Sequence, residues 1–547
     1  MRSLYTCGLG LLVALGVSVN TTFGQNNTEG KDKKTITQQN WHHLDPKKNK
    51  YVGISTDKAY NNLLKDKKMT RVVVAVLDGG VDINHEDLKG RIWVNPKEIP
   101  GNGIDDDNNG FIDDINGWNF IGNASGANLN QTTLELTRQY KLLSEKYKQV
   151  NPIALKGEDL AEYNNYLKIK AEFNTKYEKA KKTYDLFQNF AANYIFCDSI
   201  LSSVLKKKDY TIEDVQALKV EGNDQMNDIK KYMITVLKKG INRQEFTDYK
   251  EYLESQVKYK YNLDFNPRAE IMGDNLETFD KYYGNNNVIG PDPEHGTFVS
   301  GVIAAVRNNG LGVNGIADSV KIMVVRVIPD GDEYDKDVAN AIIYAANNGA
   351  DIINCSFGKS YSPQKQFVDE ALQYAQSKGV LIVHAAGNDA ENNDSIVHYP
   401  ANLDTFGNTL INNWLTIGAS SAKADKTLAA SFSNYGEKSV DLFAPGSRIY
   451  STKPFNKYGT MDGTSFSAPM VAGAAALVKS AYPSLTASQL KEILLKSVVR
   501  YPKLKVLKPI KEEGKKPEKI KFSELSSTAG VLNVYEALKL AEKYAVK

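Results

Sequence analysis

The chain has 547 residues, of which 41% are hydrophobic and 24% charged, so it is a globular protein with enough apolar residues for a large core. Its formal net charge is only +3, which gives no support to nucleic acid as a partner or to a polybasic contact with membranes. After the first residues, no segment is long and apolar enough to span a bilayer, so we expect no stable insertion into a membrane.

Residues 1–25 have the features of a signal peptide. They contain one early arginine, then an apolar run from Leu9 to Val19, then small and polar residues. A membrane anchor is the alternative interpretation, but the apolar run is short for one. We therefore expect a mature protein outside the cytoplasm, secreted or periplasmic, in which Cys197 and Cys355 are free and buried.

Two stretches, 70–127 and 263–545, have the pattern of an α/β domain. Near-continuous apolar runs rich in Val and Ile predict strands that are covered on both faces, at residues 71–80, 320–328, 351–357 and 379–388. Helical patterns between them close on glycine, at residues 335–349 and 364–379. The predicted fold class is α/β, with a parallel central sheet flanked by helices.

Two further segments adjoin this domain. The N-terminal extension 26–69 contains residues 40–68, which we interpret as an entry helix and strand packed on the core. Near the end of the domain, the lysine-rich residues 505–521 predict an exposed loop, because charge runs are commonly solvated.

Residues 128–262 predict an all-helical insertion of roughly four helices. Lys, Glu, Tyr and Asn dominate there, and aromatic residues from Tyr163 to Phe187 follow the three/four spacing of one apolar helix face. Thr211 with Asp214 resembles a capping box that opens another helix. Helix pattern alone favours a packed accessory bundle, and a dedicated partner-binding or regulatory arm is the alternative.

A serine near the C-terminal end raises a catalytic hypothesis. Ser465 directly precedes a small-residue helix, where free backbone N–H groups and the helix dipole would stabilise a developing oxyanion. An ordinary helix-capping serine is the alternative. His295 also precedes a small-residue helix, and Asp78 ends a predicted buried strand. The order Asp78, His295, Ser465 matches one of the three known arrangements of a catalytic triad.

The motifs around these residues resemble those of the subtilisin family of serine endopeptidases. The matching blocks are VVVAVLDGGVDINHEDL around Asp78, HGTFVSGVIAA around His295 and GTSFSAPMVAGAAAL around Ser465, with HAAGND and SFSNYGEKSVDLFAPG between them. The resemblance covers about residues 70–127 and 288–500. It implies that the chain hydrolyses peptide bonds of polypeptide substrates through an acyl-enzyme, with no organic cofactor.

The resemblance also implies roles for individual residues. Asn388 aligns with the asparagine that binds the oxyanion together with the backbone N–H of Ser465. One segment would pair with an extended peptide substrate: Ser356, Phe357 and Gly358. Together with Ala385, Ala386 and Gly387, it would line the pocket for the residue before the scissile bond.

The chain departs from the family pattern in three ways. Asp78 and His295 are 217 positions apart, where ordinary members have a few tens, and the helical insertion accounts for the difference. Phe298 replaces a frequent second histidine, which is not the catalytic base. Only about 45 residues lie between the predicted signal peptide and the first strand, where the family's usual inhibitory prodomain would barely fit, if at all.

The sequence predicts a calcium site by resemblance. The loop 307–317 is similar to the family's calcium loop, which implies these ligands: the side chains of Asp87 and Asn309 and the backbone carbonyls of Arg307, Leu311 and Val313. Calcium prefers such an all-oxygen set.

A second candidate calcium loop lies at residues 102–114. Five of its positions match an EF-hand-like loop, at Asp105, Asp107, Asn109, Gly110 and Asp113. The glutamate expected at the twelfth position is replaced by Asn116. A turn-rich loop held by its own Asp and Asn side chains is the equally weighted alternative.

Two other functions compete with a general secreted endopeptidase. One is an inactive family member that serves as a scaffold through the insertion, against which the intact triad argues. The other is a processing protease with few substrates, in which the insertion 128–262 forms an exosite for a partner.

Overall fold

The computed structural model describes residues 39–511 and 516–545, so the predicted signal peptide lies outside the described residues. Within them, the chain divides into two compact units. Thr132–Phe265 belong to one unit, and the residues up to Gln131 and from Asn266 onward belong to the other. The sequence placed the helical insertion at 128–262, and the α/β pattern on either side of it.

The larger unit is built on a nine-stranded sheet in which every neighbouring pair except β10–β13 is parallel. The predicted parallel α/β fold is therefore confirmed. The strands, in their order across the sheet, are β10 (Val499–Arg500), β13 (Gly530–Val531), β7 (Leu442–Pro445), β6 (Trp414–Ser420), β5 (Leu381–Ala385), β4 (Ile352–Cys355), β1 (Val72–Asp78), β3 (Val320–Arg326) and β2 (Gly117–Asn119).

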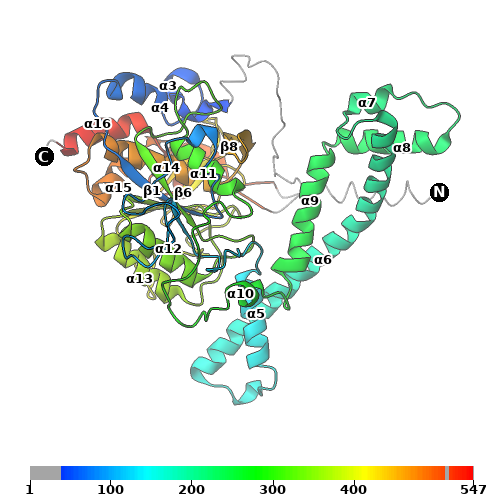
Figure 1. Ribbon diagram of the computed structural model, residues 1–547, viewed down its shortest axis with the longest axis horizontal. Coiled ribbons are helices and arrows are strands. Elements are labelled where there is room, and N and C mark those ends of the chain that lie inside the picture. Colours follow the sequence, from blue (N-terminus) through cyan, green and yellow to red (C-terminus); the bar gives the residue numbers. More distant parts are fainter. Residues whose placement is uncertain (1–38, 512–515, 546–547) are drawn as a thin grey trace. The chain divides into compact units, whose positions relative to one another are not determined.

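The alternation of side chains along β1 explains why the sheet carries helices on both faces. Val74 and Val76 belong to one hydrophobic core, whereas Val73, Ala75 and Leu77 belong to a second. The first core packs against α11 (Glu294–Ala304), α14 (Thr464–Ala481), α15 (Ala487–Lys496) and α16 (Val534–Ala545). The second packs against α12 (Asp335–Asn347) and α13 (Lys365–Ser377), which Figure 1 shows in yellow-green.

The segment before the sheet and the lysine-rich segment differ from the prediction. Residues 40–68 contain only short helical turns: η1 (Trp41–His43), α3 (Pro46–Asn49), α4 (Thr56–Ala59) and the π-helix η2 (Tyr60–Leu64). The expected strand is replaced by single contacts such as the bond from the Val52 N–H to the Ala422 carbonyl. Lysines 505 and 519 lie on a hairpin of β11 (Lys505–Leu507) and β12 (Lys519–Lys521), where the buried Val506 anchors the pair.

The smaller unit is helical, as predicted. Tyr163 to Phe187 lie on one helix, α6, and Thr211 and Asp214 form the predicted capping box with two reciprocal hydrogen bonds. The helices are α5 (Glu135–Lys146), α6 (Gly157–Leu205), α7 (Ile212–Ala217), α8 (Asp224–Lys238), α9 (Arg243–Ser255) and the π-helix η5 (Gln256–Lys260). The two ends of the unit lie together, because the Leu134 N–H donates to the Lys260 carbonyl at 3.1 Å.

Both cysteines of the described chain are free and buried, as expected, with Cys197 in the helical unit and Cys355 at the end of β4. None of the helices within the described residues combines the length and the apolar character that crossing a membrane requires.

Candidate active site

The carboxylate of Asp78 and the imidazole of His295 are joined at the carboxyl edge of the sheet. Asp78 is the last residue of β1 and only 3% exposed, and His295 is the second residue of α11. The His295 Nδ1 lies 2.9 Å from both carboxylate oxygens of Asp78. The Gly79 N–H donates to Asp78 Oδ1 at 2.8 Å and fixes the carboxylate from the other side. The carboxylate thus holds the Nδ1 edge of the imidazole, and the His295 side chain remains 39% exposed.

Three carboxylates act on the charge of His295. Burial opposes the charged imidazolium, but the carboxylates of Asp78, Asp292 and Glu294 outweigh it and raise the pKa of His295 above its ordinary value. A raised pKa makes the ring a stronger proton acceptor when it is neutral, as a general base near neutral pH requires.

A glycine permits the close approach of α11 to β1. A Cβ atom on Gly296 would lie 2.1 Å from the Gly80 carbonyl oxygen and 3.1 Å from the Cβ of Asp78. No larger residue fits there without displacing the helix that carries His295. The glycine after the histidine is therefore required by packing.

Ser465 is the second residue of α14, where the backbone N–H groups of a helix have no partner within the helix. Its Oγ donates to the Ser356 carbonyl at 3.1 Å, and its own carbonyl accepts from Ser356 Oγ at 2.8 Å. The next residue, Phe466, has its ring centroid 5.6 Å from that of His295. Ser465 and His295 thus come from helices that pack together, and the serine hydroxyl is turned toward β4.

Asn388 is oriented by the residue that precedes Ser465. Its Oδ1 accepts hydrogen bonds from the backbone N–H of Thr464 at 2.9 Å and from the Thr464 hydroxyl at 3.0 Å. Because Thr464 occupies the amide oxygen, the NH₂ group of Asn388 faces away from Thr464. Asn388 itself is exposed. Sequence reasoning singled out Asn388 but missed Thr464, whose position directly before the serine was the available signal.

The segment that the sequence assigned to substrate pairing follows β4. Phe357 has its carbonyl fixed by His384 Nε2, which donates to it at 2.9 Å, and burial lowers the pKa of His384 to about 4, so this ring is neutral. Lys359 then pairs with Tyr399 in an isolated antiparallel bridge. Ala385 ends β5, the strand next to β4. The two predicted segments therefore lie on adjacent strands at the same edge as Asp78.

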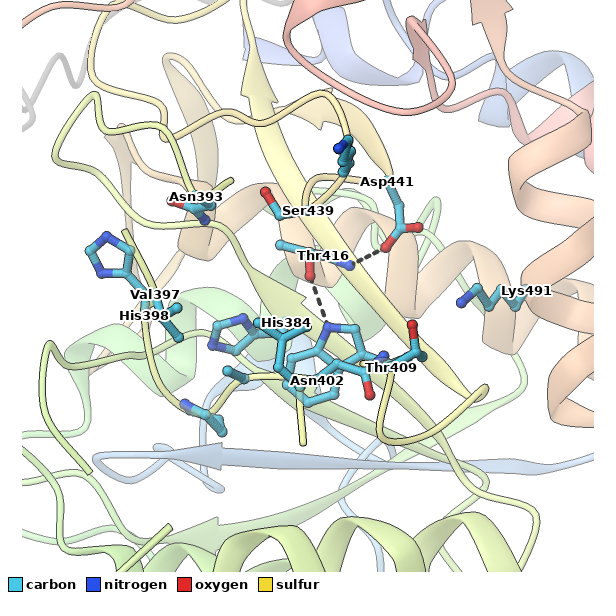
Figure 2. Close-up of a pocket in the computed structure, with 15 residues that line it drawn as sticks. His384, Asn393, Val397, His398, Asn402, Thr409, Thr416, Ser439, Asp441 and Lys491 are labelled. Carbon is cyan, nitrogen blue, oxygen red and sulfur yellow. Dashed lines mark hydrogen bonds between the residues drawn. The ribbon is translucent and has the colours of Figure 1, made fainter. Parts of the chain in front are cut away.

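A cavity with a volume of about 190 Å³ lies beside His384. Figure 2 shows side chains that line it. Within it, Trp414 Nε1 donates to Thr416 Oγ1 at 2.8 Å, and the Thr416 N–H donates to Asp441 at 2.8 Å. Burial raises the pKa of Asp441 to about 6. Since His384 both lines the cavity and fixes Phe357, the cavity borders the predicted substrate-pairing segment.

Phe298 occupies the place of the frequent second histidine. It is fully buried and packs on Phe466, with 4.4 Å between the ring centroids. This contact joins α11 to α14, so the substitution serves the packing that brings His295 near Ser465.

The first predicted calcium loop lies around Asp87. This carboxylate is fully buried, and its oxygens accept from Asn309 Nδ2 at 2.6 Å and from the Val313 N–H at 3.1 Å. Leu311 donates its N–H to Asn309 Oδ1 at 2.9 Å. The Arg307 guanidinium binds the Gly315 carbonyl and Asp57. The structure thus brings the predicted residues of this loop together.

Comparison with known proteins places the chain in a family. The model for the subtilase family matches residues 70–519. Subtilisin DY of Bacillus licheniformis is 37% identical over 204 residues, which are 37% of this chain and 68% of that protein. Subtilisin BL of Lederbergia lenta is 39% identical over 201 residues, 37% of this chain and 68% of that protein. For a thermophilic serine proteinase of Bacillus sp. (strain AK1), the identity is 41% over 187 residues, 34% of this chain and 42% of the relative.

The chain belongs to the subtilase family of serine peptidases. It is a serine endopeptidase that acts on polypeptide substrates, as predicted.

The packing of α11 on β1 generates a prediction. In Gly296→Ala, the new Cβ must push α11 away from Gly80, which costs about 1–3 kcal/mol by overpacking and breaks the bond between Asp78 and His295. The far-downfield proton signal of His295 Nδ1 in the NMR spectrum should disappear. Ser300→Ala, on the same helix, is the control, because its Oγ forms no hydrogen bond among the described residues. Retention of the downfield signal in Gly296→Ala would show that the close approach is unnecessary.

Proposed function

We propose that Ser465 is the nucleophile, His295 the general base and Asp78 the orienting acid of this endopeptidase. The observation that carries the proposal is the 2.9 Å contact of His295 Nδ1 with both Asp78 oxygens, beside the helix that begins with Thr464 and Ser465. Asp78 selects the tautomer with the proton on Nδ1, so Nε2 is free to accept the serine proton.

The reaction follows from these roles. Ser465 Oγ attacks the peptide carbonyl while His295 takes its proton, and His295 then gives that proton to the leaving amine as the C–N bond breaks. A water molecule next attacks the acyl carbon while His295 takes its proton, and this proton passes to Ser465 Oγ as the Oγ–C bond breaks and the product with the new carboxyl group leaves. The hydroxyl donates to the Ser356 carbonyl in this structure, so it must first rotate toward His295; catalytic hydrogen bonds commonly form only in the substrate complex.

The oxyanion of each tetrahedral intermediate is assigned to the Asn388 NH₂ group and the Ser465 backbone N–H. Anchoring of the Asn388 oxygen by Thr464 supports this role, because it orients the donor before substrate binds. Loss of one such donor costs about 2.7–4 kcal/mol of transition-state stabilisation.

An extended substrate is expected to add as a strand beside Ser356, Phe357 and Gly358. Main-chain hydrogen bonds would hold it, while Ala385, Ala386 and Gly387 form the opposite wall. The neutral His384, which fixes the Phe357 carbonyl, supports a preformed edge.

A serine-directed fluorophosphonate probe tests the triad. We expect it to label Ser465 in the active protein, and we expect Ser465→Ala to abolish labelling and to lower kcat by about 10⁶-fold. Peptide mapping by mass spectrometry identifies the labelled residue. Labelling of another serine, or full activity of the alanine variant, would refute the assignment.

Calcium is proposed to bind at Asp87. Among the described residues this buried carboxylate forms hydrogen bonds to neutral donors but no ion pair, so its negative charge is uncompensated. A cation held by Asp87, Asn309 Oδ1 and the carbonyls of Arg307, Leu311 and Val313 would neutralise it with oxygen ligands alone. The ion would act by stabilising the fold.

Calcium dependence of the melting temperature tests this site. In the Ser465→Ala background, which prevents self-digestion, adding calcium at about 100 times its Kd should stabilise the fold by about 2.7 kcal/mol. Part of this calcium-dependent shift arises at the loop 307–317, and Asp87→Asn should remove most of that part. An equal shift with and without Asp87 would contradict the proposal.

Signal-directed export to the outside of the cytoplasm is proposed from residues 1–25, as a secreted or periplasmic enzyme. The support is the charged, apolar and small-residue order of this segment.

The helical insertion is proposed to act as an exosite for protein substrates or a partner. Exposed apolar side chains support this role, since Ile153 is 91% exposed and Ile195 and Phe196 are about half exposed. Packing within the bundle leaves these apolar surfaces in contact with water.

Excision of the insertion tests the exosite. Because Leu134 and Lys260 are hydrogen-bonded, a short Gly/Ser linker can join the ends of the larger unit. We expect cleavage of a folded protein substrate to change several-fold more than cleavage of a small chromogenic peptide. Equal changes for both substrates, in a variant with an unchanged circular dichroism spectrum, would leave the insertion a structural role only.

A further inference from the structure

An acidic loop, residues 98–114, lies in the segment between β1 and β2 and does not include the Asp78–His295 pair. Its carboxylic residues are Glu98, Asp105, Asp106, Asp107, Asp113 and Asp114. The loop leads into Phe111, whose ring packs against Trp118 at 5.1 Å and Tyr344 at 5.0 Å between centroids. It is therefore continuous with the core beneath β2 and α12.

Three of these carboxylates converge. Glu98, Asp105 and Asp107 each offer one oxygen, and these oxygens all lie within 4.8 Å of one another. Glu98 is 7% exposed and the Asp107 side chain 3% exposed, so two of the three charges are almost wholly withdrawn from water. Burial, together with the charges of Asp107 and Asp106, raises the pKa of Glu98. Such a cluster is repulsive unless a cation shares it.

Glu98 carries an acceptor atom without a donor. Its Oε1 accepts the Asp107 N–H at 3.1 Å, but its Oε2 is buried and has no hydrogen-bond partner among the described residues. Buried polar atoms are nearly always partnered, so an orphaned oxygen on a carboxylate that lies within 4.8 Å of two others indicates a missing positive group. Lys97 does not supply it, since its Nζ is 3.9 Å from Asp107 and the side chain is 71% exposed.

Asp113 and Asp114, two other acidic residues of the loop, form hydrogen bonds outside the cluster. Both Asp113 oxygens accept backbone N–H groups, from Gly101 at 2.8 Å and Gly103 at 2.9 Å. Asp114 accepts from the Tyr344 hydroxyl at 2.6 Å and from Asn95 at 2.7 Å. These carboxylates shape the loop and attach it to α12, and they do not join the cluster.

The Asn109 side chain is engaged in the same way. Its Oδ1 accepts the Phe111 N–H at 2.8 Å, and its Nδ2 donates to Asp114 at 3.1 Å. Its backbone N–H donates to Asp105 and Asp107, which retain further lone pairs for a ligand. Asn109 therefore holds the two aspartates in place.

We propose that Glu98, Asp105 and Asp107 form a calcium-binding site, with Glu98 supplying the carboxylate that the sequence of the loop lacks at its twelfth position. Calcium is favoured because the cluster offers only carboxylate oxygens on a loop, the hard and adaptable ligand set that this ion prefers. Asn109 and Asp113 of the predicted ligand set act as loop-shaping residues. The bound ion ties residue 98 to residues 105–107 and stiffens the entry to β2.

Calorimetric titration of calcium into the full chain tests the proposal. The protein carries Ser465→Ala to prevent self-digestion and Asp87→Asn to disable the other loop, and it is first stripped with chelator. We expect a remaining calcium-binding event, at least tenfold weaker after Glu98→Gln or Asp107→Asn. Asp106→Asn is the matched control, because this neighbouring carboxylate accepts from Ile99 and Asn102 outside the cluster; its loss removes a nearby charge but no ligand, so it should weaken binding much less.

Melting temperatures provide a readout that does not depend on tight binding. In chelator, Glu98→Gln should melt above its parent, because it removes one buried charge from a repulsive cluster. In calcium the order should reverse. Absence of calcium binding in the parent, unchanged affinity in both Glu98→Gln and Asp107→Asn, or the same order of melting temperatures in chelator and calcium would each overturn the proposal. Triad labelling by the fluorophosphonate probe is independent of these outcomes.

Discussion

The hydrogen bond between Asp78 and His295 joins the end of β1 to the start of α11 and fixes the geometry of the site. It requires a buried strand to deliver a carboxylate to the edge of the sheet, and a helix close enough to deliver an imidazole. β1 meets the first requirement, because it lies between β3 and β4 and every one of its residues is buried. The glycine at position 296 meets the second.

A buried arginine secures the same edge. Arg326, at the end of β3, is 1% exposed and donates to the carbonyl of Gly79 at 2.8 Å and to Asn119 Oδ1 at 3.0 Å. Burial lowers the pKa of Arg326 to about 10. Asn119 in turn bridges to Asn285, so the chain is fixed on both sides of the point where the insertion leaves and returns. A long insertion is tolerated in the sequence between Asp78 and His295 because these contacts hold the edge without it.

The sequence predicted the features that depend on residues close together in the chain. Apolar runs identified β1, β3, β4 and β5, and the motifs around Asp78 and His295 identified two side chains that the fold brings into contact. Contacts that form only when the chain folds back on itself could not be predicted from local patterns. The orphaned Oε2 of Glu98 depends on how residue 98 folds back on residue 107. The anchoring of Asn388 by Thr464 needs β5 and α14 to meet, and the 505–521 hairpin depends on one buried valine.

The charge of Asp78 sets the proton affinity of His295. NMR titration of the His295 ring, in full-length Ser465→Ala protein, measures this directly. Because Asp78 stabilises the imidazolium, the pair adds stability at low pH that is lost as pH rises through the raised pKa, and the neutral base forms above it. We expect a His295 pKa above the ordinary 6.5, which falls by about 1–3 units in Asp78→Asn. The same pKa with and without the Asp78 charge would contradict it.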